Sequence, residues 1–356
     1  MKKILITGSL GYLGSVLSKY LSERGYNCLG YDIGFFEKNL LHPQIDTTTY
    51  FCDARDVNEF HLKNIDVVVH LAGISNDPMG KLNPSKIYDP TRQYAFDIAK
   101  HCKKMGIKFI FASSCSIYGL GSDNLLNEDS EVFPQTGYSL NKLQIEQDLK
   151  SISDKSFSPI ALRFATVFGM SPRIRFDVVI NMLTGMAFTS KKIILNSNGE
   201  AWRPNLHILD LCKAVQGAID LDYKEGELLV LNVGSNENNL KIIDIANIIN
   251  KSIKGCELKF LNENPELDKE GLIRDRKVKN EDTRTYKVSF DKITKVIPNF
   301  KCDWSVENGV IDLVNKFEEH QLTLDKFQDK NFYRLQHLEY LYENNLISDE
   351  LRWLKK

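Results

Sequence analysis

The chain has 356 residues, 46 of them basic and 47 acidic, so its formal net charge is −1. This balance argues against nucleic acid or another polyanion as a partner, and no apolar run is long enough to cross a membrane. The seven cysteines are scattered without a C-x-x-C pair, which predicts reduced thiols in a cytoplasmic protein and no metal site.

A glycine-rich turn follows the first expected strand, Lys3–Thr7, and leads into a helix expected over 15–24. The turn consists of Gly8, Ser9, Leu10, Gly11, Tyr12, Leu13 and Gly14. Glycines let the backbone approach a diphosphate closely, and the N-terminus of the following helix offers N–H groups to it. We therefore interpret the turn as a dinucleotide site; the alternative is a glycine-rich turn without a ligand.

The next two expected strands, 27–31 and 48–52, are each followed by an aspartate. At Asp32, a carboxylate accepts hydrogen bonds from the adenosine ribose and repels a 2′-phosphate, which predicts NAD(H) and not NADP(H). An aspartate that only shapes the next turn is the alternative. Asp53, followed by Ala54, is either an adenine contact or the cap of a helix, and both interpretations stay open.

A continuous apolar run over residues 66–73 is typical of a strand buried on both faces of a parallel sheet. Its end, Leu71-Ala72-Gly73, is small enough for a cofactor to lie against the backbone. We interpret His70, just before this end, as a packed and hydrogen-bonded side chain and not as a catalyst.

Tyr138 and Lys142 lie four residues apart at the start of an expected helix, 138–150, so both are on one face. A free tyrosine ionises near pH ~10, and an ammonium beside it favours the phenolate. Ser114 follows an expected strand at 108–112 and adds a hydroxyl at the edge of the sheet where ligands bind. Without that context, the pair would be a half-buried tyrosine beside a solvated lysine.

These motifs together resemble the extended short-chain dehydrogenase/reductases of the nucleotide-sugar epimerase/dehydratase family. The resemblance rests on the order and spacing of the glycine turn, Asp32, Asp53, 70–73, 114–119, Tyr138, Lys142, 162–169 and 203–210. It covers residues 1 to about 315. It implies a Rossmann-type doubly wound parallel sheet with a smaller C-terminal α/β substrate-binding region. It also implies NAD as the cofactor and a nucleotide-diphosphate sugar as the substrate.

By the same resemblance, Ser114 is the catalytic hydroxyl, Tyr138 is the base, and Lys142 holds the nicotinamide ribose and tunes Tyr138. Residues expected to bind the cofactor are Gly8, Gly11, Tyr12, Leu13, Gly14, Asp32, Asp53, Ala54, Leu71, Ala72, Gly73, Tyr138 and Lys142. Residues expected to bind the substrate are Ser114, Cys115, Ser116, Asn181, Arg203 and Arg284. Guanidinium groups match phosphate oxygens in a bidentate way; Arg173 and Arg175 are either further substrate contacts or surface charges.

Two positions depart from the family pattern. The family's 4,6-dehydratases carry Asp-Glu directly after the catalytic hydroxyl, whereas this chain has Cys115-Ser116. Neither side chain is a carboxylic acid that could help to remove a sugar hydroxyl, so dehydration is disfavoured. Thr91, after Pro90, stands where the family usually has asparagine.

We expect residues 1–170, with 203–235 returning to them, to form the NAD-binding domain. The nucleotide-sugar-binding region is expected over 171–202 and 236–320, with a mobile loop at 262–282. Residues 321–356 are expected to form a helical tail, with an amphipathic helix at 333–344, that packs on its own subunit; a site for a separate partner is the alternative.

The resemblance also implies a homodimer, in which helices 88–105 and 138–150 pair with their copies in the second subunit. Four apolar positions on these helices would then be partly interfacial. They are Ile98, Leu143, Ile145 and Leu149.

The catalytic candidates suit oxidation of a sugar hydroxyl or reduction of a ketone. NAD favours a cofactor that is recycled in place, and hence an epimerase cycle, with C4 as the attacked carbon by resemblance. A nucleotide-sugar 4-keto-reductase or 4-dehydrogenase with net redox is the alternative. A non-catalytic NAD-binding sensor is disfavoured because such a protein would often lack the tyrosine or the lysine.

Overall fold

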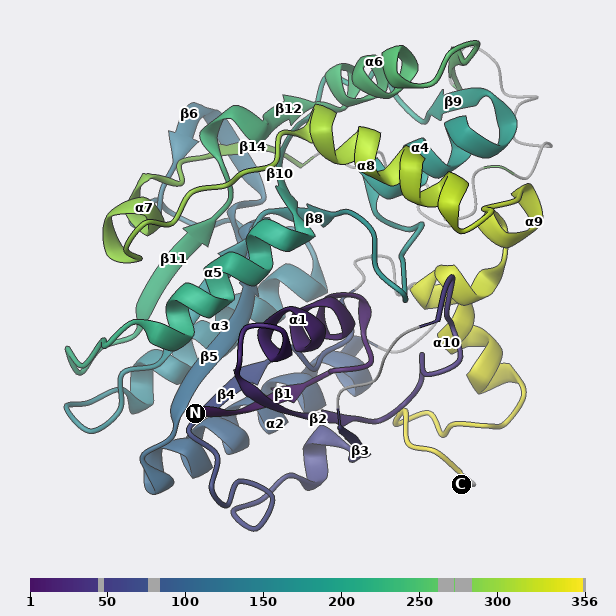
Figure 1. The fold of residues 1–356 in the computed structure, drawn as a ribbon. Helices are drawn as coiled ribbons and strands as arrows, with labels where there is room; N and C mark the ends of the chain where they lie inside the picture. Colours follow the sequence, from purple (N-terminus) through teal and green to yellow (C-terminus); the bar gives the residue numbers. More distant parts are fainter. Residues whose placement is uncertain (44–47, 76–83, 262–271, 273–283, 355–356) are drawn as a thin grey trace.

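The computed structural model describes residues 1–43, 48–75, 84–261, 272 and 284–354. Its centre is a seven-stranded sheet with the order β11-β7-β5-β4-β1-β2-β3 (Figure 1), and every neighbouring pair in it is parallel. The strands are β1 (Lys3–Thr7), β2 (Asn27–Asp32), β3 (Thr49–Phe51), β4 (Val67–His70), β5 (Lys108–Ser114), β7 (Ile160–Phe164) and β11 (Leu229–Val233). The predicted doubly wound parallel sheet is therefore confirmed.

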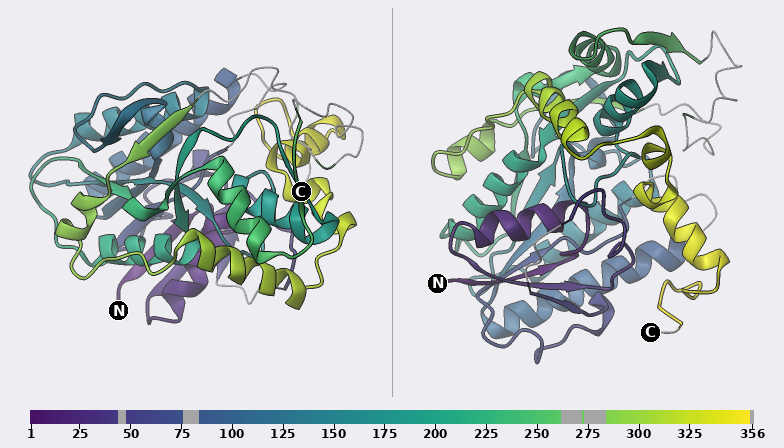
Figure 2. Two further views of the ribbon diagram at one scale, coloured as in Figure 1. Left: turned by 90° about the horizontal axis from the view of Figure 1, so that it is seen from above. Right: turned by 45° about the vertical axis from the view of Figure 1, so that its right-hand side comes forward.

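Helices cover both faces of this sheet (Figures 1 and 2). Because side chains alternate along a strand, Ile4 and Ile6 pack toward one face and Leu5 toward the other. The first face carries α1 (Tyr12–Ser22) and α5 (Ile208–Asp220), and the second carries α2 (Pro84–Met105) and α3 (Gly137–Ile152). The chain builds β1 to β3 outward and then returns to β4 on the other side of β1. This reversal creates a switch point between β1 and β4, where dinucleotides bind in such sheets.

A second region with its own hydrophobic core lies at one end of the central sheet (Figure 1). Its helices are α4 (Val179–Ser190), α6 (Ile242–Ser252) and α8 (Val306–Glu319). Three small sheets accompany them: β8 (Thr166–Phe168), β10 (Trp202–His207) and β12 (Asn239–Lys241); β9 (Lys192–Leu195) and β13 (Glu257–Phe260); and β6 (Leu120–Leu126) and β14 (Thr285–Val288). The expected mobile loop at 262–282 lies outside the described residues, apart from residue 272.

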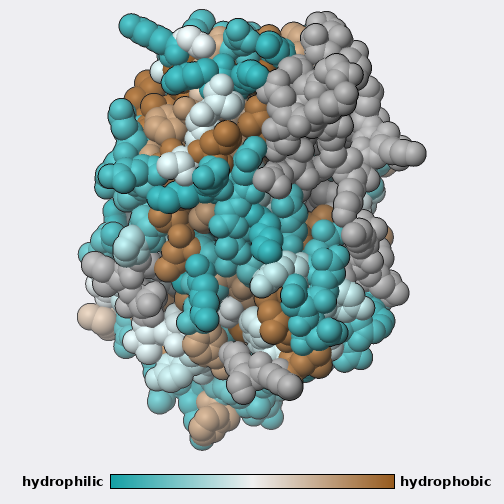
Figure 3. Space-filling view, turned by 90° about the vertical axis from the view of Figure 1, so that its right-hand side faces the viewer, coloured by the Kyte–Doolittle hydropathy of each residue, from teal (hydrophilic) through white to brown (hydrophobic). Residues whose placement is uncertain are grey.

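The C-terminal tail packs on its own subunit, as expected. It contains α9 (Leu324–Phe327) and α10 (Arg334–Glu343). Leu335, Leu338 and Leu341 of α10 pack in one cluster with Phe35 and Ile87. The face of the molecule that carries the tail shows hydrophobic residues in separate small patches among hydrophilic ones (Figure 3). The tail thus directs most of its apolar side chains inward.

The expected interface positions are partly wrong. Ile98, Ile145 and Leu149 are each 0% exposed, in a cluster that α2 and α3 form with the central sheet. Only Leu143 is half-buried and remains open to a second subunit. The homodimer itself stays a prediction, and a dimer interface would have to use other side chains of these helices.

Within the part of the chain that the structure describes, no helix is both long and apolar enough to span a membrane. The described residues also contain no cluster of three or more His, Cys, Asp or Glu side chains that could hold a metal ion.

Candidate active site

One continuous cavity of about 1190 Å³ runs along the carboxyl edge of the central sheet. Residues that follow β1, β2, β3, β4 and β5 line it, and so do residues of the second region. Sites for single small molecules are typically about 300–1,000 Å³. This cavity is therefore large enough for a dinucleotide together with a second ligand.

The glycine turn after β1 is shaped for close backbone approach. Gly8 has φ +75°, and a Cβ atom there would lie 2.9 Å from the backbone nitrogen of Ala72. A Cβ atom on Gly14 would lie 2.1 Å from the carbonyl oxygen of Gly8. Gly11 caps α1, and the first turn of this helix borders the cavity through Tyr12 and Leu13. Free N–H groups at a helix N-terminus suit a diphosphate, so the turn fits a dinucleotide.

Asp32 stands at the end of β2 and borders the cavity. Its carboxylate accepts hydrogen bonds from the backbone N–H of Leu10, at 2.9 Å, and of Gly34, at 2.7 Å. Burial raises the pKa of this carboxyl, and the two N–H donors act in the opposite direction. Asp32 therefore holds the glycine turn in place and remains beside the position expected for the adenosine ribose.

Asp53 caps the short helix after β3, because its carboxylate accepts a hydrogen bond from the backbone N–H of Arg55 at 3.0 Å. The capping interpretation is thus confirmed. Asp53 and Ala54 both also line the cavity, so an adenine contact stays a prediction.

The end of β4 also agrees with the expectations. Leu71, Ala72 and Gly73 all line the cavity. His70 is buried, with its Nδ1 2.9 Å from the hydroxyl of Thr7 and its ring stacked near Phe109. Burial lowers the pKa of His70 to about 3. The predicted packed and hydrogen-bonded histidine is therefore confirmed.

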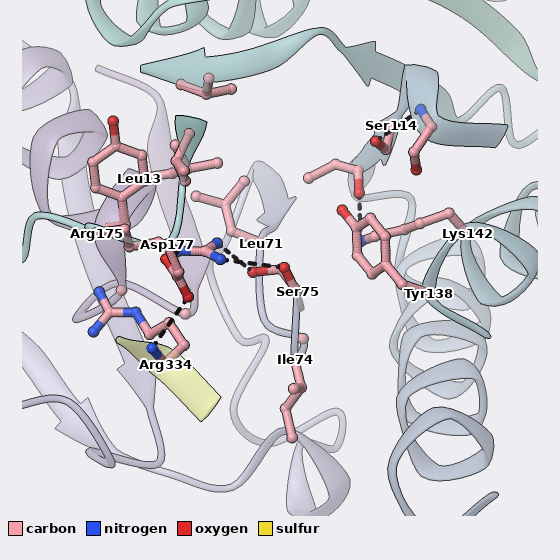
Figure 4. Close-up of a pocket in the computed structure, with 18 of the residues that line it drawn as sticks. Leu13, Leu71, Ile74, Ser75, Ser114, Tyr138, Lys142, Arg175, Asp177 and Arg334 are labelled. Carbon is pink, nitrogen blue, oxygen red and sulfur yellow. Dashed lines mark hydrogen bonds and ion pairs between the residues drawn. The ribbon is translucent and has the colours of Figure 1, made fainter. Parts of the chain in front are cut away.

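The start of α3 fixes the position of the tyrosine. Thr136 accepts a hydrogen bond from the N–H of Ser139 at 3.2 Å, and the hydroxyl of Ser139 accepts one from the N–H of Thr136 at 3.1 Å. This capping box holds the first turn, which contains Tyr138. Lys142 follows one turn later, with its Nζ 5.6 Å from the centre of the Tyr138 ring. Both side chains line the same side of the cavity (Figure 4).

Lys142 is only 6% exposed. Its Nζ donates a hydrogen bond to the carbonyl oxygen of Ala112 at 2.7 Å, which ties α3 to β5. Burial lowers the pKa of Lys142 to about 8, although the carboxylate of Glu146 acts in the opposite direction. The ammonium therefore remains the main form at neutral pH and is lost as the pH rises past about 8.

Ser114 and Ser116 line the cavity, whereas Cys115 between them points away from it. Ser114 ends β5, and its Oγ accepts a hydrogen bond from the N–H of Ser116 at 3.2 Å. The Ser116 hydroxyl is buried without a hydrogen-bond partner in the described part of the chain. The thiol of Cys115 is 1% exposed and donates to the carbonyl of Arg163, and burial raises its pKa. The structure therefore does not place Cys115 where it could bind a substrate.

A buried polar network lies directly behind the catalytic candidates and was not predicted. Arg163 on β7 pairs with Glu146 on α3 at 2.7 Å, and both side chains are less than a tenth exposed. Arg163 also donates to the hydroxyl of Tyr118 at 2.9 Å, and the hydroxyl of Ser113 donates to Glu146. Glu146 stands one helical turn after Lys142, and this spacing is the signal in the sequence that could have indicated it.

Asn181 lies behind the cavity wall and not on it. Its side chain is 0% exposed, accepts a hydrogen bond from the N–H of Gly169 at 3.0 Å and donates to the hydroxyl of Tyr12 at 3.2 Å. Asn181 therefore joins α1 to the loop that follows β8, and the expected contact of Asn181 with a diphosphate is wrong.

The two other arginines expected to bind the substrate, Arg203 and Arg284, do line the cavity, and Arg203 donates a hydrogen bond to the carbonyl of Arg284.

The sequence left open whether Arg173 and Arg175 are substrate contacts or surface charges, and the structure shows that neither is a surface charge. Arg173 is 2% exposed and donates to the carbonyl of Phe36 at 3.1 Å. Arg175 lines the cavity, where it pairs with Asp177 at 2.8 Å and donates to the hydroxyl of Ser75 at 2.9 Å. Figure 4 shows Arg175 on the side of Leu13, across the cavity from Tyr138 and Lys142.

Comparison with known sequences gives one family and many relatives. The model of the NAD dependent epimerase/dehydratase family matches residues 4–234. A curated protein of Bacillus subtilis (strain 168), named an uncharacterized UDP-glucose epimerase, YtcB, is 28% identical over 262 residues. These residues cover 68% of this chain and 80% of that protein.

Solved structures share the fold. TunA, a NAD-dependent NDP-hexosamine 5,6-dehydratase of tunicamycin biosynthesis, has a TM-score of 0.76 at 19% identity, covering 90% of this chain and 98% of its own. The UDP-glucose 4-epimerase of Thermotoga maritima has a TM-score of 0.73 at 19% identity. The match covers 90% of this chain and 99% of the epimerase. The UDP-glucuronic acid 4-epimerase of Bacillus cereus was solved with UDP-glucuronic acid and NAD, and it has a TM-score of 0.68 at 20% identity. The match covers 89% of this chain and 99% of that epimerase.

Proposed function

Because the chain belongs to the NAD-dependent epimerase/dehydratase family, we propose that it oxidises and re-reduces a nucleotide-activated sugar at C4, so that the net reaction is an epimerisation. The observation that carries this proposal is the grouping of Ser114, Tyr138 and Lys142 on one side of a cavity that has room for two ligands. NAD is the cofactor of the family, and the glycine turn and Asp32 provide the places that would hold it.

The proposed reaction assigns a separate task to each side chain. The Tyr138 phenolate takes the proton of the sugar hydroxyl and returns it after the sugar has turned over. Ser114 donates a hydrogen bond to the same sugar oxygen, and the Lys142 ammonium stabilises the phenolate and holds the nicotinamide ribose. Bound NAD supplies the site that accepts and returns the hydride.

The residues beside Ser114 favour this reaction over dehydration. Elimination of a sugar hydroxyl needs an acid to protonate the leaving group. Cys115 points into the protein and Ser116 carries a hydroxyl, so neither supplies a carboxylic acid. Net oxidation or reduction at C4 remains the second candidate, because it uses the same three side chains.

We assign the nucleotide sugar to the second region, residues 171–202 and 236–320, and NAD to residues 1–170 with 203–235. Arg284 of the second region and Arg203, where the chain returns to the first, both line the cavity. Their guanidinium groups suit the diphosphate of the substrate, and a homodimer is the assembly that the family resemblance implies.

The function is tested by incubating the purified protein with UDP-, dTDP-, GDP- and CDP-sugars. We expect one sugar nucleotide to give a new stereoisomer, seen by NMR, without build-up of NADH at 340 nm. Stoichiometric NADH would instead identify a dehydrogenase, and loss of water from the sugar would identify a dehydratase. Mass spectrometry of the cofactor that co-purifies should find NAD.

Asp32 makes a further prediction about the cofactor. NAD(H) should bind at least tenfold more tightly than NADP(H), or about 1.4 kcal/mol, because the carboxylate repels a 2′-phosphate. Calorimetric titration of both cofactors measures this ratio. Asp32→Asn removes the negative charge but keeps nearly the same shape, so it should reduce the preference for NAD(H) over NADP(H). Equal affinities for the two cofactors in the unmodified protein would contradict the proposed role of Asp32.

A further inference from the structure

The C-terminal tail contributes to the wall of the cavity, although it lies outside the residues that the family model matches. Arg334 and Leu338 of α10 border the cavity, and so do Glu350 and Leu351 near the end of the chain. The latter two belong to a small hairpin, residues 347–353, closed by an antiparallel bridge between Ile347 and Trp353. We call this segment the terminal hairpin.

The terminal hairpin lies at one particular end of the cavity. The catalytic Ser114 follows β5, and Asp53 follows β3, which is the edge strand of the sheet. Four strand spacings of about 4.8 Å separate β5 from β3, or roughly 19 Å. A dinucleotide whose nicotinamide is at Ser114 and whose diphosphate is at the glycine turn after β1 thus places its adenosine at β2 and β3.

Two sets of contacts fasten the terminal hairpin to the segments that follow β2 and β3. The indole nitrogen of Trp353 donates to the carbonyl of Ile33 at 2.7 Å. The guanidinium of Arg55, held by Asp53 at 2.9 Å, donates to the carbonyls of Glu350, at 2.6 Å, and Leu351, at 2.9 Å. Asp53 is therefore connected to the tail through Arg55.

Leu351 has an unusual backbone conformation. Its φ is +55°, in a region that residues with side chains sparsely occupy. Such conformations persist only where the surroundings fix them, and they cluster at ligand clamps. Here the carbonyl of Leu351 is fixed by Arg55, its N–H donates to the carbonyl of Ser348 at 2.9 Å, and its side chain is 5% exposed.

We propose that the terminal hairpin is part of the cofactor site and encloses the adenine end of NAD, with Leu351 as its wall and Arg55 as the link to the sheet. The tail then slows release of the cofactor, which suits a reaction in which NAD is recycled and does not leave. The inference rests on the proposed function only in that NAD occupies this cavity.

The test compares two variants of the terminal hairpin with a matched control elsewhere in the C-terminal tail. Trp353→Ala removes an anchor of the terminal hairpin, and Leu351→Ala shortens the wall itself. The control is Leu346→Ala, which removes a leucine side chain of the tail that is 41% exposed. Circular dichroism first establishes that each variant is folded. Calorimetry then measures the affinity for NAD and for ADP-ribose, and stopped-flow displacement measures the rate at which NAD leaves.

We expect both variants to bind NAD and ADP-ribose at least fivefold more weakly, by a similar factor for the two ligands, and to release NAD faster. The control should match the unmodified protein. A lower melting temperature with unchanged affinities in either folded variant would assign the terminal hairpin a purely structural role and overturn the inference. If the unmodified protein itself fails to bind NAD, it is the proposed function that fails.

Discussion

Tyr138→Phe is expected to lower turnover by the ~10²–10⁴-fold that a lost general acid–base typically costs. The change deletes one hydroxyl from a side chain of nearly the same shape. The capping box between Thr136 and Ser139 and the contact of Lys142 with Ala112 do not involve that hydroxyl. The fold and the affinity for NAD should therefore persist. The measurement is turnover of the identified sugar nucleotide, with NAD affinity determined in parallel.

Two neighbouring substitutions sharpen this test. Lys142→Ala should reduce turnover comparably and also weaken NAD, because the same ammonium serves the phenolate and the ribose. Ser114→Ala should cost less than Tyr138→Phe, because it removes a hydrogen bond and leaves the proton acceptor. Near-normal turnover in Tyr138→Phe with NAD still bound would mean that another group is the base.

The pH profile gives an independent check on Lys142. Burial lowers its pKa to about 8, so the ammonium predominates below that pH and is lost as the pH rises through it. Activity should accordingly decline on the alkaline side near pH 8. Residual activity in Lys142→Ala should show no decline there, since no ammonium is left to titrate.

The sequence predicted those features that follow from local chemistry. The glycine spacing forces the turn after β1, and the four-residue spacing of Tyr138 and Lys142 places them together whatever surrounds the helix. Ser114 joins them because parallel strands end at one edge of the sheet. These three residues do line one cavity.

Features that depend on which distant segment of the chain packs against a residue were not predictable in the same way. Asn181 was expected to face a ligand, but the rotation of α4 directs it to Tyr12, 169 residues away. Ile98 and Ile145 were recognised as apolar, but helical periodicity does not reveal whether a sheet or a second subunit covers them. The roles of Leu351 and Trp353 depend on contacts some 300 residues distant, for which a single sequence carries no signal.

The buried pair of Glu146 and Arg163 leads to the largest expected effect on stability. Glu146→Leu should lower the free energy of unfolding by roughly 3–5 kcal/mol, because it leaves the buried guanidinium without its counter-charge. Urea unfolding followed by circular dichroism measures the loss. As a control, Glu319→Gln removes one partner of the exposed pair with Lys316, and it should leave the free energy of unfolding nearly unchanged because water screens exposed pairs.

The double variant Glu146→Leu/Arg163→Met decides whether the charge pair or the packing is responsible. Replacing both members of a buried pair by apolar side chains of similar size is often close to neutral, whereas removing one is not. The double variant should therefore recover most of the stability that Glu146→Leu loses, and the two substitutions should be strongly non-additive. Additive losses would show that the network of Ser113 and Tyr118 depends on each side chain separately. Since Glu146 also favours the ammonium of Lys142, the alkaline decline in activity should move to lower pH in the double variant, which links this network to the catalytic lysine.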